Sequence, residues 1–147
     1  MSLPQIVVSV DVPVTPLVAH RLFTEGMGTW WPLASHSVFD DRAVTVRFPA
    51  AVGEPIVESS ADGREATWGT VLENDPGSVV RFTWHPGRDA ATAHEIEVRF
   101  ASTDAGTHVT LTHDGWEASA DPGMWAGYDT GRVLVLDEFV RTASPGA

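Results

Sequence analysis

Residues 94–113 read HEIEVRFASTDAGTHVTLTH, and this stretch decides the fold. Apolar and polar side chains alternate on both sides of a short turn at residues 103–106, which indicates two antiparallel β-strands joined as a hairpin. The turn predicts a register in which Ile96 lies opposite His113 on the buried face. His94 then lies on the same face as a diagonal neighbour of His113, about 7–8 Å away.

The segments before this hairpin show the same alternation, separated by turn sequences such as Asp62-Gly63 and Asp75-Pro76-Gly77. If Trp84 pairs with His94 across the preceding loop, Phe82 joins the buried row beside Ile96. We expect Trp68 to lie inside as well, although one step of register slip would turn it outward. The predicted strands are residues 6–12, 44–48, 55–59, 65–74, 78–84, 94–102 and 107–113, and in the second of these Val44, Val46 and Phe48 alternate with Thr45 and Arg47.

Three helices complete the pattern. Thr15 followed by Pro16 is a typical helix start, and Gly26 is expected to end this first helix. A short helix follows over residues 27–31, and a long one over residues 124–142. The chain is therefore predicted to be a single α+β domain over residues 1–147, in which a curved antiparallel sheet wraps around the C-terminal helix. The element order is one strand, two helices, six strands and one helix.

The composition of the 147 residues excludes several classes of function. Nine basic side chains stand against 20 acidic ones, a net charge of −11 that opposes nucleic acid and anionic membranes. There is no cysteine and no lysine, which excludes thiolate and Schiff-base chemistry. No membrane-spanning segment, secretory signal, phosphate loop or metal-ligand spacing is evident, so we expect a cytoplasmic protein without metal or cofactor.

His94 and His113 are the candidate catalytic residues. Imidazole titrates near neutral pH, so the pair could serve as a general base and a hydrogen-bond donor inside a cavity. The alternative is that both are structural histidines, hydrogen-bonded at the ends of their strands. Two residues without a third ligand do not indicate a metal site.

Arg132 is predicted to project from the apolar arc of the last helix, near Trp125, Tyr128 and Leu136. An uncommitted charge is costly at such a position. The guanidinium could bind an anionic ligand group in a pocket. It could also reach solvent along its aliphatic stem or pair with an acidic neighbour such as Asp129.

Aromatic side chains are the candidate pocket lining. Six tryptophans are present, and most of them fall at the ends of predicted elements, where a cavity would open. The alternative is that they simply fill the core. The predicted ligand-binding residues are Trp30, Trp31, Trp68, Phe82, Trp84, Ile96, His113, Trp116, Trp125, Tyr128 and Arg132.

Several short motifs resemble a known family. In chain order they are Leu22-Phe23-Thr24, Trp30-Trp31-Pro32, Trp68-Gly69-x-Val71-Leu72, Phe82-Thr83-Trp84, Glu97-Val98-Arg99-Phe100, Thr107-x-Val109-x-Leu111-x-His113-x-Gly115-Trp116 and Gly127-Tyr128-x-x-Gly131. The chain resembles the bacterial START-like proteins of the SRPBCC superfamily, in the subgroup named after the heat-shock-protein ATPase activator homologue. The resemblance implies a helix-grip fold with a cavity between the last helix and the sheet. Where the subgroup usually continues Gly-Trp, this chain has Gly131-Arg132.

The expected function is binding of a small, partly hydrophobic molecule in that cavity, with Arg132 holding a polar or acidic group. One alternative is an enzyme of the cyclase, dehydratase or hydrolase kind that uses a cavity histidine on a bound carbonyl compound. Another is a co-chaperone-like stress-response protein, which would need an exposed apolar patch. A homodimer formed through an outer strand is left open.

Overall fold

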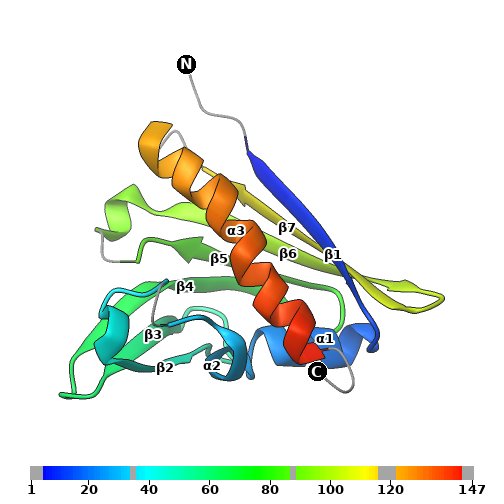
Figure 1. The fold of residues 1–147 in the computed structure, drawn as a ribbon, viewed down its shortest axis with the longest axis horizontal. Helices are drawn as coiled ribbons and strands as arrows, with labels where there is room; N and C mark the ends of the chain where they lie inside the picture. Colours follow the sequence, from blue (N-terminus) through cyan, green and yellow to red (C-terminus); the bar gives the residue numbers. More distant parts are fainter. Residues whose placement is uncertain (1–4, 34–35, 87–88, 116–121, 144–147) are drawn as a thin grey trace.

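The structure is a computed structural model that describes residues 5–33, 36–86, 89–115 and 122–143. Seven antiparallel strands form one curled sheet in the spatial order β1-β7-β6-β5-β4-β3-β2, and the long C-terminal helix crosses its inner face (Figure 1). The elements in chain order are β1 (Ile6–Val12), α1 (Pro16–Phe23), α2 (Met27–Trp30), β2 (Ala43–Arg47), β3 (Pro55–Ser60), β4 (Glu65–Asp75), β5 (Val79–Trp84), β6 (His94–Thr103), β7 (Gly106–Asp114) and α3 (Pro122–Ala143). The predicted α+β fold and element order are confirmed.

The predicted register of the central strands is also confirmed. Ile96 lies opposite His113 across β6 and β7, and Trp84 lies opposite His94 across β5 and β6. Trp68 is 1% exposed, as expected for the inner face. The alternation of side chains thus places one continuous row of buried residues across β5, β6 and β7.

Two local predictions were wrong. Val44 was grouped with the buried Val46, but it is 60% exposed because the β2–β3 pairing shifts register between Ala43 and Thr45. Such a bulge turns the residues before it to the other face. The first helix ends at Phe23, before Gly26, although its start is as predicted, with Thr15 Oγ1 accepting a hydrogen bond from Val18 N at 3.3 Å.

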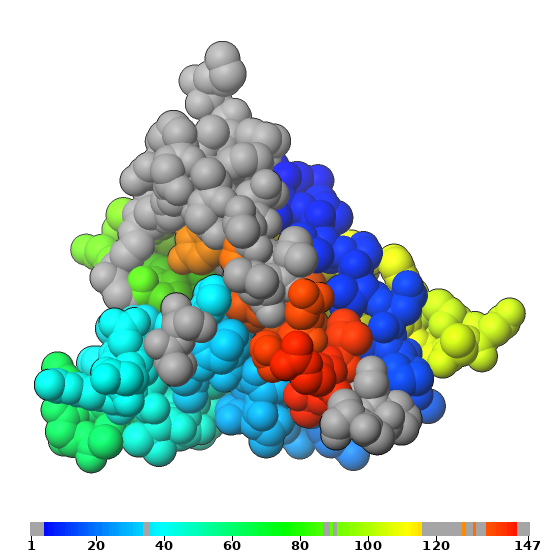
Figure 2. Space-filling model, in the orientation of Figure 1, coloured from blue at the N-terminus to red at the C-terminus, as the bar shows by residue number. Residues whose placement is uncertain are grey.

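Aromatic rings close one end of the interior. The ring of Phe139 in α3 lies 5.6 Å from Phe23 and 5.2 Å from Trp30, between centroids, and Phe23 also contacts Phe100 of β6. The C-terminal part of α3 lies between β1 and the segment that carries α2 (Figure 2). Burying a large apolar side chain contributes about 1.5–3 kcal/mol, so this end is a stabilising core.

The outer face of the sheet is polar. Arg81 on β5 lies between two carboxylates, with its Nη1 2.7 Å from Glu95 and its Nε 3.5 Å from Glu73. Arg99 pairs with Glu97 on the same strand. The outward charges leave little room for a broad apolar docking surface on these strands. Within the described residues, no helix is long and apolar enough to span a membrane.

Two glycines provide a test of the packing. A Cβ atom on Gly69 of β4 would lie 1.7 Å from the carbonyl oxygen of Thr83, so we expect Gly69→Ala to lower the free energy of unfolding by about 3 kcal/mol or more. On Gly131 of α3 the nearest atom would be Nε2 of His36 at 3.7 Å, an ordinary contact. Gly131→Ala should therefore stabilise the protein by up to about 1 kcal/mol, since alanine favours helix. Urea unfolding measures both, and equal effects would contradict the packing described.

His20 of α1 provides a test of pH dependence. Its side chain is buried against the ring of Phe100, and burial lowers the pKa of His20 below 6.5. The unfolded chain therefore binds more protons, so stability falls as the pH drops below the unfolded pKa of about 6.5. We expect the loss of unfolding free energy between pH 7.5 and 5.5 to be smaller in His20→Gln than in the wild type. Parallel pH profiles of the two proteins in urea titrations would contradict this assignment.

Candidate functional site

The other end of the interior contains the two candidate histidines. His94 is the first residue of β6 and is 2% exposed, whereas His113 near the end of β7 is fully buried. Their strands pair so that both side chains point to the inner face, together with Trp84 of β5. The local sequence alternation therefore brings two imidazoles into an otherwise aromatic region.

The two imidazoles are hydrogen-bonded to each other. His94 Nδ1 lies 3.0 Å from His113 Nε2, and the ring centroids are 5.1 Å apart. The diagonal register predicts only the spacing of the backbone positions, and the side chains close the remaining gap. One nitrogen must donate and the other must accept, so the bond fixes how protons are distributed over the pair.

Tyr128 of α3 brings a third titratable side chain to the pair. Its ring centroid lies 4.8 Å from that of His113 and 6.5 Å from that of His94. The two histidines come from the sheet and the tyrosine comes from the helix, so the cluster joins both layers of the fold. Such a group of imidazole and phenol side chains can bind and polarise a carbonyl or hydroxyl group.

An indole wall continues from the histidine pair across the sheet. Trp84 lies 5.4 Å from Trp68 and 5.7 Å from Trp31 between ring centroids, and Trp31 lies 5.0 Å from Trp68. Phe82 contacts the ring of Trp84 at 5.9 Å. Four of the predicted lining residues are thus neighbours on one wall.

The remaining predicted site residues are not all placed. Trp30 is buried at the closed end, where its Nε1 donates to the carbonyl oxygen of Leu22 at 2.9 Å. Trp116 lies outside the described residues. Trp125 and Arg132 belong to α3, but their side chains are not among those described.

Glu58 of β3 is a buried residue that the sequence reasoning missed. Its side chain is fully buried, and Oε1 accepts hydrogen bonds from Val38 N and Trp68 Nε1, both at 2.8 Å. Oε2 accepts a bond from Phe39 N, also at 2.8 Å. The only sequence signal is the alternation of β3, which places residue 58 on the same face as the buried Ile56.

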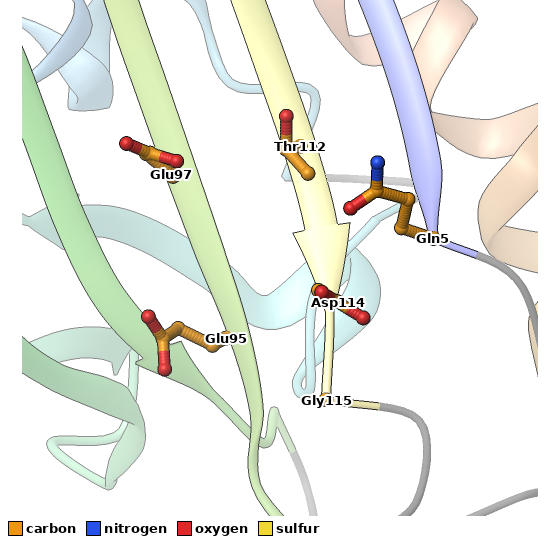
Figure 3. A pocket seen from close by; sticks show the side chains of 6 residues that line it. All are labelled: Gln5, Glu95, Glu97, Thr112, Asp114 and Gly115. Atoms are coloured by element: carbon orange, nitrogen blue, oxygen red, sulfur yellow. The ribbon is translucent and has the colours of Figure 1, made fainter. Parts of the chain in front are cut away.

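A shallow pocket of about 230 Å³ lies on the opposite face of the same strands. Its lining is polar, with Glu95 and Glu97 from β6 and Asp114 from the end of β7 (Figure 3). Because successive side chains alternate across a strand, Glu95 points away from the interior that His94 faces. This pocket is therefore separate from the histidine pair.

A model of the family described as Activator of Hsp90 ATPase homolog 1-like protein matches residues 21–143. The chain belongs to this family. The family model covers every described element from the end of α1 to the end of α3, and so includes the histidine pair, Glu58 and the indole wall. The suspected START-like, SRPBCC-type relationship is thereby confirmed.

Solved structures from this fold agree with the assignment. The Aha1 dimer from Colwellia psychrerythraea is similar at a TM-score of 0.73 and 17% identity, with 98% of each chain covered. The AHSA1-like protein from Aeromonas hydrophila has a TM-score of 0.67 and 20% identity, covering 94% of this chain and 90% of the other. An anthrahydroquino-γ-pyrone synthase, Txn09, has a TM-score of 0.63 and 29% identity, covering 97% of this chain and 96% of its own. No curated protein matches the chain.

The Glu58 site can be tested by a substitution that keeps shape and size. In Glu58→Gln the amide nitrogen would replace an oxygen that accepts a backbone N–H, so one buried donor would lose its partner. We expect the free energy of unfolding to fall by about 1–3 kcal/mol. Glu65→Gln on the exposed start of β4 is the matched control and should change stability by less than about 0.5 kcal/mol. Equal stability of both variants in urea unfolding would contradict the role of Glu58.

Proposed function

We propose that the protein binds a small, partly hydrophobic molecule beside the His94–His113 pair, between the N-terminal half of α3 and the inner face of the sheet. The observation that carries the proposal is the hydrogen bond between two buried imidazoles, in contact with Tyr128 and adjoining an aromatic wall. Pockets for small molecules combine such apolar walls with a few polar groups.

The placement of the polar groups supports a ligand more than a purely structural role. The other end of the interior is built mainly from aromatic side chains such as Phe23 and Phe139, and there the buried imidazole of His20 packs against Phe100. Burying imidazole costs free energy unless it is hydrogen-bonded, and an apolar pair would avoid that cost. Two imidazoles and a phenol gathered at one end therefore favour a site that recognises a carbonyl or hydroxyl group.

The proposed ligand class is a flat, carbonyl-bearing aromatic compound. The indole wall presents aromatic rings for stacking, and the histidine pair places two imidazoles at the edge of that wall. The likeness to a synthase of an anthrahydroquino-γ-pyrone supports the same class. Arg132, four residues after Tyr128 in α3, remains the predicted partner of an acidic ligand group.

A second candidate function is proton transfer on the bound compound, as in a cyclase, dehydratase or hydrolase. The histidine pair favours it, because one imidazole can accept a proton from the substrate while its partner stabilises the resulting charge through their hydrogen bond. Such general base catalysis contributes about 10²–10⁴-fold in rate.

The relatives also bear on two further proposals, a homodimer and a co-chaperone role. A homodimer is proposed because the Colwellia relative is a dimer, and β1 and β2 are the strands at the sheet edges in this chain. A co-chaperone role has less support, since the outer side chains of β6, such as Glu95, Glu97 and Arg99, are charged.

Tryptophan fluorescence tests the binding proposal. Titration with 1,8-dihydroxyanthraquinone should quench the wild-type protein in a saturable way, since the indole wall adjoins the site. We expect His113→Gln to weaken binding about tenfold, equivalent to one lost hydrogen bond of about 1.4 kcal/mol. His108→Gln on the outer face of β7 is the matched control and should bind like the wild type.

Circular dichroism confirms that each variant is folded before its affinity is compared. Arg132→Ala separately tests whether the guanidinium binds an acidic group of the ligand. The ligands for this test are analogues of 1,8-dihydroxyanthraquinone that carry a salicylate group. Unchanged affinity in a folded His113→Gln variant, or no quenching by any polycyclic ligand, would contradict the proposed site.

A further inference from the structure

Gly131 lies in the middle of α3, where neither the backbone conformation nor the described packing requires a glycine. Its backbone is helical, and its φ is not in the positive range that favours glycine. A Cβ atom would meet a neighbouring atom within 3.0 Å at Gly26, Gly28 and Gly69, so packing excludes a side chain at those positions. At Gly131 the nearest described atom would be Nε2 of His36 at 3.7 Å, which is an ordinary contact.

A glycine at this position has a cost that a larger residue would avoid. Glycine disfavours a helix relative to alanine or leucine, and a glycine inside a helix usually has a packing or functional reason. Among the side chains that the structure describes, only that of His36 comes within 4 Å of the Cβ position at Gly131. The described part of the chain therefore leaves room for a side chain here, and the sequence does not use it.

This room lies on the face of α3 that carries Tyr128. Residues three apart are neighbours on the surface of a helix, about 4.5 Å apart along its axis. Tyr128 and Gly131 are both half-buried, and the ring of Tyr128 contacts that of His113 at 4.8 Å between centroids. The room beside Gly131 thus extends the proposed ligand site by nearly one helical turn towards Phe139.

His36 faces Gly131 from a segment that hydrogen bonds hold in place. Nε1 of Trp31 donates to the carbonyl oxygen of His36 at 2.6 Å, so the segment adjoins the indole wall. The backbone N–H groups of residues 38–39 donate to the buried carboxylate of Glu58. The backbone of His36 is therefore fixed, and its imidazole forms a wall of the space on the side that faces α3.

We propose that Gly131 is a specificity-determining residue of the ligand site. The space beside it, between α3 and the imidazole of His36, receives the far ring of a fused-ring ligand whose polar edge lies at the His94–His113 pair. This inference rests on the proposed function, because it extends the same site. A larger residue at position 131 would fill the space and leave room only for a shorter ligand.

Substitution of Gly131 by leucine tests the proposal with two ligands of different length. The first, 1,8-dihydroxyanthraquinone, has three fused rings, and the second, 2-hydroxyacetophenone, has one ring with a neighbouring hydroxyl and carbonyl group. Tryptophan fluorescence, corrected for absorption by the ligand, measures both affinities. We expect Gly131→Leu to weaken binding of the three-ring ligand about tenfold or more and that of the one-ring ligand less than about twofold, since leucine occupies only the far space.

Three controls accompany this comparison. Asp137→Leu adds the same side chain on the exposed face of α3 and should bind both ligands like the wild type. The urea midpoint of Gly131→Leu should be no lower than that of the wild type, because leucine favours a helix and the described neighbours leave room for it. His113→Gln should weaken binding of both ligands by the same factor, since both retain the polar edge.

Nuclear magnetic resonance tests the role of His36. The imidazole resonances of His36 should shift on saturation with 1,8-dihydroxyanthraquinone and stay unchanged with 2-hydroxyacetophenone, which does not reach the far space. A histidine that only supports the fold would respond to neither ligand, and that result would overturn the assignment of His36 as a wall of the site.

The negative results separate this inference from the proposed function. An equal effect of Gly131→Leu on both ligands, or a urea midpoint well below that of the wild type, would overturn the role of Gly131, and the second result would show that the chain itself fills the space. The proposed function would stand if His113→Gln still weakened binding. Discrimination by Gly131→Leu with full binding by His113→Gln would place the ligand beside Gly131 alone and contradict the proposed function. Absence of binding by the wild type would contradict both.

Discussion

The carboxylate of Glu58 accepts three hydrogen bonds in a fully buried position, and much of the interior depends on it. Two of the donors are backbone N–H groups of consecutive residues, Val38 and Phe39, and the third is the indole of Trp68. A buried charge is tolerated only where such donors surround it. The bonds hold the segment after α2 against β3 and set the orientation of Trp68. Trp68 in turn packs against Trp31 and Trp84, which lies opposite His94.

This chain of contacts divides the interior into two unlike halves. At the C-terminal end of α3, Phe139 meets Phe23 and Trp30 in ring contacts, and the indole of Trp30 donates to the backbone carbonyl of Leu22. At the other end, the indole wall leads to two hydrogen-bonded imidazoles and a phenol. The first half stabilises the packing of α3 against the rest of the fold. The second half contains the His94–His113 pair and Tyr128, and for this reason the proposed ligand site is placed there.

The sequence predicted the strands well because alternation is a direct consequence of strand geometry. The hairpin at residues 94–113 was enough to place Trp84 opposite His94 and Ile96 opposite His113. Prediction was wrong at Val44, because a bulge changes the face of a residue without changing the pattern of apolar letters. Register alone also could not predict the bond between His94 and His113, which depends on side-chain torsions.

Glu58 was missed for a different physical reason. A carboxylate in a strand is usually exposed, and only its donors make burial favourable. Those donors come from residues about twenty positions earlier and ten positions later in the chain, so no local pattern around Glu58 indicates them. The family motifs include Trp68 but give no indication that its indole binds a carboxylate.

Amide hydrogen exchange of the wild-type protein tests the central role of Glu58 most directly. Backbone N–H groups that donate to a buried carboxylate should exchange only when the surrounding core opens. We therefore predict that the amides of Val38 and Phe39 exchange as slowly as the paired amides of β5 and β6, although they lie outside any strand. Exchange at these two amides on the timescale of an open loop, with the sheet still protected, would contradict the account.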